Sequence, residues 1–147
     1  MITQATIFDI DDLVPIFDAY RGFYGKCSDL IRSRQFLVDR FCNFDSIIFL
    51  AKSDAGKAIG FVQLYPSFSS VNMQRIWILN DLFVDPSHRN SRVGERLIDK
   101  AIEYGRLTEA KKLVLQTGVS NSIAQRLYSR LGWEKEDNFI TYYLNLT

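Results

Sequence analysis

The sequence predicts a mixed α/β fold in which one central sheet is flanked by helices. Runs rich in β-forming residues alternate along the chain with segments whose apolar residues recur every three to four positions. No internal repeat, low-complexity tract or linker separates these segments. A chain of 147 residues can bury one hydrophobic core but not two. We therefore expect a single domain over residues 1–147.

The N-terminal part is predicted to hold one strand and two helices. An apolar strand covers Ile2–Ile7, and Asp9 can cap a helix that follows it. Gly22 and Gly25 are expected to interrupt this helix, and Ser28 to start a second one. The apolar positions are Leu13, Ile16, Phe17 and Tyr20 in the first helix, and Leu37, Phe41 and Phe44 in the second.

Three β-rich runs follow, over Ser46–Lys52, Ala58–Tyr65 and Arg75–Val84. A short polar loop with Gly56 separates the first two, which predicts an antiparallel hairpin. The third run is almost continuous in β-forming residues, as in a strand that is buried on both faces. It is expected at the centre of the sheet.

The remaining elements are predicted to be a helix, a strand, a helix and a strand. The first helix runs from Arg92 to about Arg106, and a strand covers Lys112–Thr117. The second helix covers Asn121–Leu131 and ends at Gly132. Apolar residues that alternate with polar ones predict the last strand, namely Ile140, Tyr142, Leu144 and Leu146.

Charge and cysteine content argue against several classes of function. The chain has 18 basic and 17 acidic residues, so it lacks the positive field that attracts nucleic acids or anionic membranes. Cys27 and Cys42 are too few for a disulfide framework, and their spacing does not suit zinc. No leader pattern or long apolar run is present. We therefore expect a cytoplasmic protein with no metal, no nucleic-acid partner and no membrane partner.

The segment from Val84 to Glu95 forms a strand–loop–helix junction that suits an anion. A helix N-terminus presents unpaired backbone N–H groups and a partial positive charge, which favour a phosphate. Arg89 and Arg92 add cationic groups, and Gly94 lets the backbone approach a ligand closely. A pyrophosphate would fit. An exposed corner with two solvated arginines explains the same residues equally well.

Two motifs resemble those of the GNAT superfamily of N-acetyltransferases, over about Trp77 to Leu146. One is similar to the family's pyrophosphate loop [Gln/Arg]-x-x-Gly-x-[Gly/Ala], with Arg92 at the first glycine position. The other is similar to its Asn-x-x-Ala-x-x-[Leu/Phe]-Tyr-x-x-x-Gly-[Phe/Trp] helix. In this chain they read Arg89-Asn90-Ser91-Arg92-Val93-Gly94 and Asn121-x-x-Ala124-x-x-Leu127-Tyr128-x-x-x-Gly132-Trp133.

This resemblance implies a GNAT-type fold, with a central mixed, mostly antiparallel sheet of about 6–7 strands flanked by about 4 helices. It also implies acetyl-CoA as the co-substrate. The implied contacts to the pantetheine arm come from the backbone of Leu82, Phe83 and Val84 and from Asn121, Ala124 and Tyr128. The implied contacts to the pyrophosphate come from Arg89, Asn90, Ser91, Arg92, Val93, Gly94 and Glu95.

The segment Leu79–Val84 is also similar to the Leu-Glu-Asp-Phe-Phe-Val stretch of diamine (polyamine) acetyltransferases and related fungal acetyltransferases. Asn80 replaces the acidic residue that helps those enzymes to meet a cationic amine. This replacement weakens the case for spermidine or spermine as the acceptor.

The resemblance implies that Tyr128 is the general acid that protonates the departing thiolate, although its place on an apolar helix face equally suits a core tyrosine. Asp81 is the nearest candidate for the general base, with Asn80 orienting a water. A purely structural carboxylate is the alternative for Asp81. Tyr20, Arg21, Tyr24 and Asn80 are the candidate acceptor-binding residues, and Arg21 could meet a substrate carboxylate; core packing and solvent exposure are the alternatives.

We therefore predict transfer of an acetyl group from acetyl-CoA to the primary amine of a small molecule, such as a polyamine-like amine or an amino acid. The alternatives are a protein lysine or N-terminal acetyltransferase and a non-catalytic acetyl-CoA-binding module. Many relatives in this family pair through their C-terminal strands, so the resemblance also implies a possible homodimer.

Overall fold

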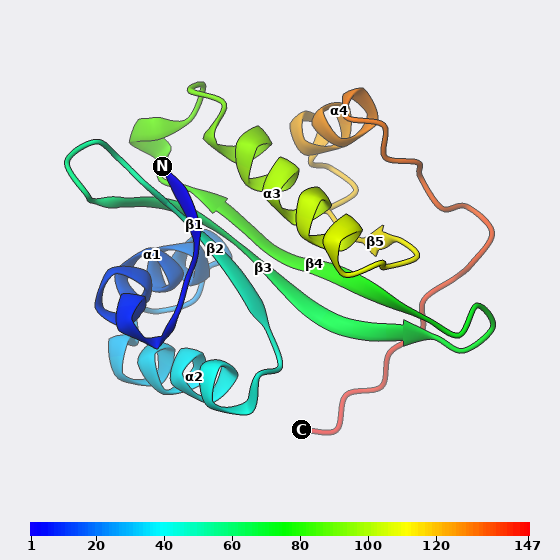
Figure 1. Ribbon diagram of the computed structural model, residues 1–147, viewed down its shortest axis with the longest axis horizontal. Coiled ribbons are helices and arrows are strands. Elements are labelled where there is room, and N and C mark those ends of the chain that lie inside the picture. Colours follow the sequence, from blue (N-terminus) through cyan, green and yellow to red (C-terminus); the bar gives the residue numbers. More distant parts are fainter. The chain divides into compact units, whose positions relative to one another are not determined.

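The computed structural model describes residues 1–147, which divide into two compact units over residues 1–115 and 116–147 (Figure 1). The first unit contains β1 (Ile2–Gln4), α1 (Ile10–Phe23), α2 (Leu30–Asn43), β2 (Ile47–Lys52), β3 (Ala58–Ser69), β4 (Gln74–Val84), α3 (Val93–Leu107) and β5 (Leu113–Val114). The second unit contains α4 (Ser122–Arg130). Short 3-10 helices cover Ile7–Asp9 and Pro86–His88. One domain over the whole chain stays a prediction.

The sheet has five strands in the order β1-β2-β3-β4-β5. The first four are antiparallel neighbours, and β5 is parallel to β4. The predicted mixed, mostly antiparallel sheet with four helices is confirmed, with fewer strands than expected. The β2–β3 hairpin is confirmed as well, since its loop closes through a 2.8 Å hydrogen bond from the Ser53 N–H to the Lys57 carbonyl.

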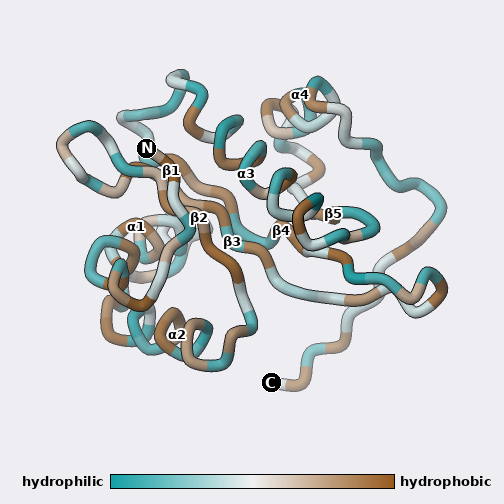
Figure 2. The backbone as a smooth tube through the Cα atoms, viewed as in Figure 1, coloured by the Kyte–Doolittle hydropathy of each residue, from teal (hydrophilic) through white to brown (hydrophobic).

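Helices cover both faces of the sheet, with α1 and α2 on one face and α3 on the other (Figure 1). Phe17 of α1 packs against Phe61 of β3 in the core of the first face. On the opposite face, the predicted stripe of α3 is buried through Leu97, Ile98 and Ala101. Figure 2 shows the apolar residues that run along β2 between these layers.

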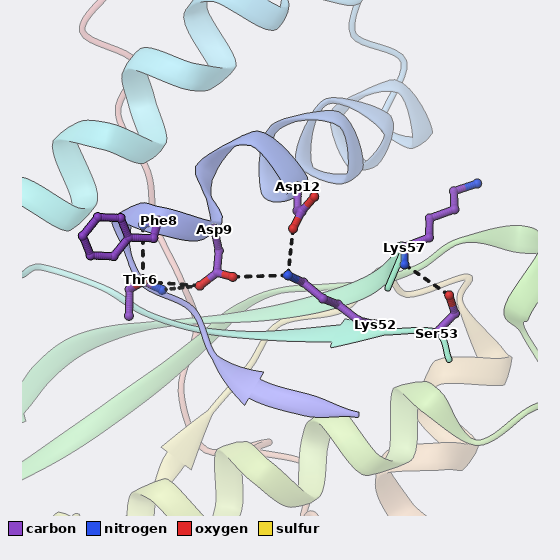
Figure 3. Close-up of polar contacts among 7 residues, drawn as sticks. All are labelled: Thr6, Phe8, Asp9, Asp12, Lys52, Ser53 and Lys57. Atoms are coloured by element: carbon purple, nitrogen blue, oxygen red, sulfur yellow. Dashed lines mark hydrogen bonds and ion pairs between the residues drawn. The ribbon is translucent and has the colours of Figure 1, made fainter. Parts of the chain in front are cut away.

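The starts of α1 and α2 differ from the prediction because other side chains make the caps. Asp9 precedes α1 but makes no side-chain cap there; its carboxylate instead accepts from the Thr6 N–H at 2.9 Å and from Lys52 at 3.3 Å (Figure 3). Asp29, not Ser28, caps α2 by accepting from the Arg32 N–H at 3.0 Å. Gly22 does not interrupt α1, which continues to Phe23.

The predicted last strand is absent from the second unit. Residues 139–147 have no regular secondary structure, and Ile140, Tyr142, Leu144 and Leu146 are exposed. Alternation gives a segment one apolar face, but a strand also needs backbone hydrogen bonds to a neighbouring strand. This segment pairs with no strand.

Candidate functional site

A β-bulge in β4 lies at the centre of the candidate site. Asp81 pairs with Gln63 of β3, and Leu79 pairs with the next residue, Leu64, so Asn80 is an extra residue in β4. A bulge bends a strand and redirects the side chains around it. Here Asn80 is exposed, whereas Asp81 is only 5% exposed.

The Asp81 carboxylate accepts hydrogen bonds from residues on both sides. The Gln63 amide donates to one oxygen at 2.7 Å, and the Asn80 amide donates to the other at 3.0 Å. The Tyr20 hydroxyl of α1 also hydrogen-bonds to this carboxylate. Burial, followed by this bond and the negative charge of Asp81, raises the pKa of Tyr20, so its phenol stays neutral near pH 7. Asp81 is therefore a buried carboxylate in a fixed orientation.

Aromatic rings from α1 cover this carboxylate. The ring of Tyr20 meets those of Phe61 and Phe83 edge-on, with centroid distances of 5.6 and 6.0 Å. The ring of Tyr24 stands 5.2 Å from that of Tyr20 and is 66% exposed. The structure thus brings the predicted residues Tyr20 and Tyr24 together, and Tyr20 contacts Asp81.

Arg21 makes its contacts elsewhere within the chain. Its guanidinium lies 3.5 Å from the Asp18 carboxylate and donates to the Cys27 carbonyl at 3.2 Å. Asp18 in turn accepts from the hydroxyls of Ser28 and Ser33 and joins α1 to α2. In this arrangement Arg21 supports the connection between the two helices.

The other edge of β4 is open next to the bulge. β4 pairs with β5 only at Trp77 and Ile78, so residues Leu79–Val84 have no strand partner on that side. Backbone N–H and C=O groups in such a gap can bind an extended ligand, in the way that a strand would. The predicted contact residues Leu82, Phe83 and Val84 belong to this open stretch.

The loop between β4 and α3 has left-handed backbone at two non-glycine residues, Asn90 with a φ of 69° and Arg92 with a φ of 60°. The family motif has glycine at the position of Arg92, and glycine adopts this conformation without a steric cost. The Arg89 side chain folds back, donating to the Val84 carbonyl at 3.2 Å. Its guanidinium lies 5.8 Å from the centre of the Phe83 ring.

The residue before α3 provides no side-chain cap. Arg92 makes no side-chain cap hydrogen bond, whereas Asp29 caps α2 and Asn121 caps α4. A Cβ on Gly94 would meet only the Val84 side chain, at an ordinary 3.6 Å, so protein packing does not require a glycine there. Uncapped N–H groups beside a residue without a side chain fit a phosphate ligand.

Two further predicted residues lie in the second unit. Asn121 precedes α4 and accepts a hydrogen bond from the Ala124 N–H at 3.2 Å. The half-buried ring of Tyr128 stands 5.7 Å from that of Trp133. Gly132 ends the helix with a φ of 89°, which confirms its predicted role as the C-terminal cap.

Gln63 is the main site residue that the sequence reasoning did not identify as a partner of Asp81. The available signal was a glutamine within the otherwise apolar run Ala58–Leu64. The side chains form no cluster of three or more His, Cys, Asp or Glu residues that could hold a metal ion. None of the helices combines the length and apolar character needed to cross a membrane.

Comparison with known proteins agrees with this geometry. The profile of the acetyltransferase (GNAT) family matches residues 13–133. The chain belongs to the acetyltransferase (GNAT) family. As a GNAT protein it is an acetyl-CoA-dependent N-acetyltransferase, and the open edge of β4 and the uncapped α3 fit the co-substrate of this family.

The similarity extends over the whole chain. A Bacillus subtilis protein named uncharacterized N-acetyltransferase YhfO is 45% identical over 99% of this chain and 97% of its own length. A probable acetyltransferase of Haemophilus influenzae is 36% identical over 87% of this chain and 84% of its own length. A crystal structure of a probable acetyltransferase superposes with a TM-score of 0.95 at 39% identity, covering 100% of this chain and 98% of the other.

One more distant structure shows the fold together with a ligand. AAC(6')-Iy, solved in complex with a bisubstrate CoA analogue, superposes on this GNAT chain with a TM-score of 0.80 at 22% identity. The match covers 99% of this chain and 97% of the other. At this level of identity, the likeness shows the fold alone.

Proposed function

We propose that this GNAT protein transfers an acetyl group from acetyl-CoA directly to the primary amine of a small molecule. The observation that carries the proposal is the Asp81 carboxylate, which is buried at the β4 bulge, oriented by Gln63 and Asn80, and covered by Tyr20. A carboxylate in this position suits both the capture of an ammonium group and the removal of its proton.

Acetyl-CoA supplies an activated thioester when it is bound. The residues that would hold it are the open backbone stretch Leu82–Val84 and the loop from Arg89 to Glu95 at the start of α3. Arg92, whose side chain is exposed, would help to neutralise the charge of the pyrophosphate. Asn121 and Ala124 of α4 would contact the pantetheine arm, as the family motif implies.

Each proton in the transfer needs a defined carrier. The amine must lose its proton to become nucleophilic, and Asp81 accepts that proton directly or through a water held by Asn80. The C–N bond would then form as the C–S bond breaks, and Tyr128, the acid that the family motif implies, would give its proton to the departing sulfur. The second N–H proton released from the former amine would return the Tyr128 phenol to its neutral form. Tyr20 and Tyr24 bind the body of the acceptor through their rings.

The acceptor is a small amine because the group that meets it is enclosed. Asp81 is buried, and Tyr20, which hydrogen-bonds to it, packs against Phe61 and Phe83, so little room is left for an extended peptide chain. The resemblance to polyamine enzymes favours a polyamine-like amine, and the absence of an acid at position 80 favours a less highly charged one. A cytoplasmic location and a homodimer stay predictions.

The test combines binding with turnover. Calorimetric titration with acetyl-CoA is expected to show binding, and thiol release is expected to depend on an added amine from a panel of polyamines, amino acids, aminoglycosides and lysine peptides. Turnover of peptides alone would support a protein acetyltransferase. Binding without any turnover would support a non-catalytic acetyl-CoA-binding module instead.

A substitution at Asp81 tests its role as the general base. Asp81→Asn is expected to lower kcat/KM by about 10²–10⁴-fold and to remove the acid limb of its pH dependence, which is the rise in rate as the base loses its proton. Asp99→Asn on the exposed side of α3 is the matched control, and it should change neither the pH dependence nor the magnitude of kcat/KM. An unchanged pH profile in Asp81→Asn would show that its carboxylate is structural.

A further inference from the structure

Four buried side-chain atoms of the protein have no hydrogen-bond partner, and they belong to β3, to the end of α2 and to the segment between α2 and β2. They are Arg40 Nε, Asp45 Oδ1, Ser46 Oγ and Gln63 Oε1. Gln63 and Tyr65 are two residues apart on β3 and therefore share a face of the sheet. The register that pairs Ile47 with Leu64 places Ser46 opposite Tyr65.

Arg40 and Asp45 complete the group from the end of α2. Their Nε and Oδ1 atoms are 2.8 Å apart but do not meet in hydrogen-bond geometry. Burial raises the pKa of Tyr65, the charges of Asp81 and Asp45 raise it further, and Arg40 lowers it. The Tyr65 phenol is therefore within electrostatic range of both the Asp81 carboxylate and the Arg40–Asp45 pair. We call Arg40, Asp45, Ser46, Gln63 and Tyr65 the Tyr65 subsite.

The energetic cost of the Ser46 and Gln63 atoms requires an explanation, because Arg40 Nε and Asp45 Oδ1 at least lie within ion-pair distance of each other. A buried polar atom without a partner costs about 1–3 kcal/mol, and native structures contain few of them. Gln63 is fully buried, whereas the side chains of Arg40 and Asp45 are 25% and 43% exposed, so the ion pair lies on the solvent side of the subsite. A partly exposed pair contributes about 0–1 kcal/mol and can open for a ligand at little cost.

The chemistry of the four atoms selects the ligand. Arg40 and Ser46 offer donors, while Asp45 and Gln63 offer acceptors. The opposite charges of Arg40 and Asp45 neutralise each other. A second charged group on the ligand would therefore meet no unpaired opposite charge in the subsite. A hydroxyl group both donates and accepts, and it therefore matches this set.

We propose that the Tyr65 subsite binds a hydroxyl group on the acceptor, whose amino group lies at Asp81 on the same face of the sheet. The acceptor class is then a hydroxylated primary amine. This inference rests on the proposed function, because Asp81 must receive the reacting amine.

The first experiment compares amines that have the same number of carbon atoms and differ only in the group at the end opposite the amine. Aminopentanol, pentylamine, diaminopentane and aminopentanoate, with the same series from propyl to hexyl, are assayed for acetyl-CoA-dependent thiol release. We expect the best amino alcohol to exceed its alkylamine by about tenfold in kcat/KM, the value of one well-placed hydrogen bond. A preference for the alkylamine, the diamine or the amino acid overturns the inference.

The second experiment connects that preference to the subsite. Ser46→Ala is expected to lower the ratio of amino alcohol to alkylamine severalfold, and Ser46→Thr to restore most of it because the hydroxyl is retained. Ser67→Ala, further along the same face of β3, is the control and should leave the ratio unchanged. An unchanged ratio in Ser46→Ala overturns the inference about the Tyr65 subsite. The proposed function is tested separately, and acetylation of any of these small amines by the wild type upholds it. Failure to bind acetyl-CoA overturns both.

Discussion

Replacement of Arg92 by glycine tests the conformation of the loop before α3. Arg92 has a φ of 60° and a ψ of 16°, and its side chain makes no cap hydrogen bond. A left-handed conformation costs a residue with a Cβ about 1–2 kcal/mol. Glycine removes that cost but adds about 0.4–1 kcal/mol of chain entropy to the unfolded state. Arg92→Gly is therefore expected to stabilise the protein by about 0.5–1 kcal/mol.

Urea unfolding measures this change, and two control variants separate its causes. Arg92→Ala removes the charge but keeps the Cβ, so the free energy of unfolding should hardly change. Arg96→Gly removes an exposed arginine inside α3 and should destabilise by about 1 kcal/mol. For a chain of this size the two glycine variants should then differ by about 3–7 °C in Tm. Equal destabilisation in both glycine variants would refute the left-handed backbone at Arg92.

Four further substitutions test other parts of the molecule. Folding lowers the pKa of Asp18, chiefly through the Ser28 hydroxyl, so its stabilisation is present above about pH 4 and is lost as pH falls through the lowered value. Urea unfolding at neutral and acid pH should therefore show less loss in Asp18→Asn than in the wild type; an equal loss would contradict this. In Gly60→Ala the new Cβ would lie 2.8 Å from the Phe83 carbonyl oxygen, which should destabilise by about 1–3 kcal/mol. Gly22→Ala, with open space around it, should stabilise by about 0.5–1 kcal/mol, and the same sign in both variants would be inconsistent with these contacts. Tyr128→Phe should lower kcat by about 10²-fold or more while acetyl-CoA still binds, and full turnover would remove its role as the acid.

The sequence predicted best those structural features that depend on residues close together along the chain. The hairpin between β2 and β3 follows from a polar loop between two β-rich runs, and α3 follows from its apolar stripe. Gly132 marks the end of α4 because its left-handed backbone is a local requirement. The junction before α3 could be proposed as an anion site from residue order alone, since a helix N-terminus carries its own unpaired N–H groups.

The starts of α1 and α2 could not be predicted from the local sequence alone. Ser28, Asp29 and Asp9 are all good capping residues by type, so composition could not choose among them. The choice was made by contacts to other elements, because Asp18 binds Ser28 and Lys52 binds Asp9. The end of β3 was also predicted too early, at Tyr65, whereas the strand continues to Ser69 and Pro66 pairs with Trp77 within the sheet.

By itself, then, the sequence determined most of the element types, the mixed sheet and the two motifs of the GNAT family, because periodicity and local motifs are properties of short segments. Only the tertiary structure decided what surrounds Asp81. The partner Gln63 lies 18 residues away in sequence, and the two meet because β3 and β4 pair in one register. The β2–β3 register, continued one residue beyond the Ile47–Leu64 pair, likewise places Ser46 opposite Tyr65. A strand register is set by long-range hydrogen bonds and by the burial of one face, so no single segment could reveal which polar groups would be enclosed together.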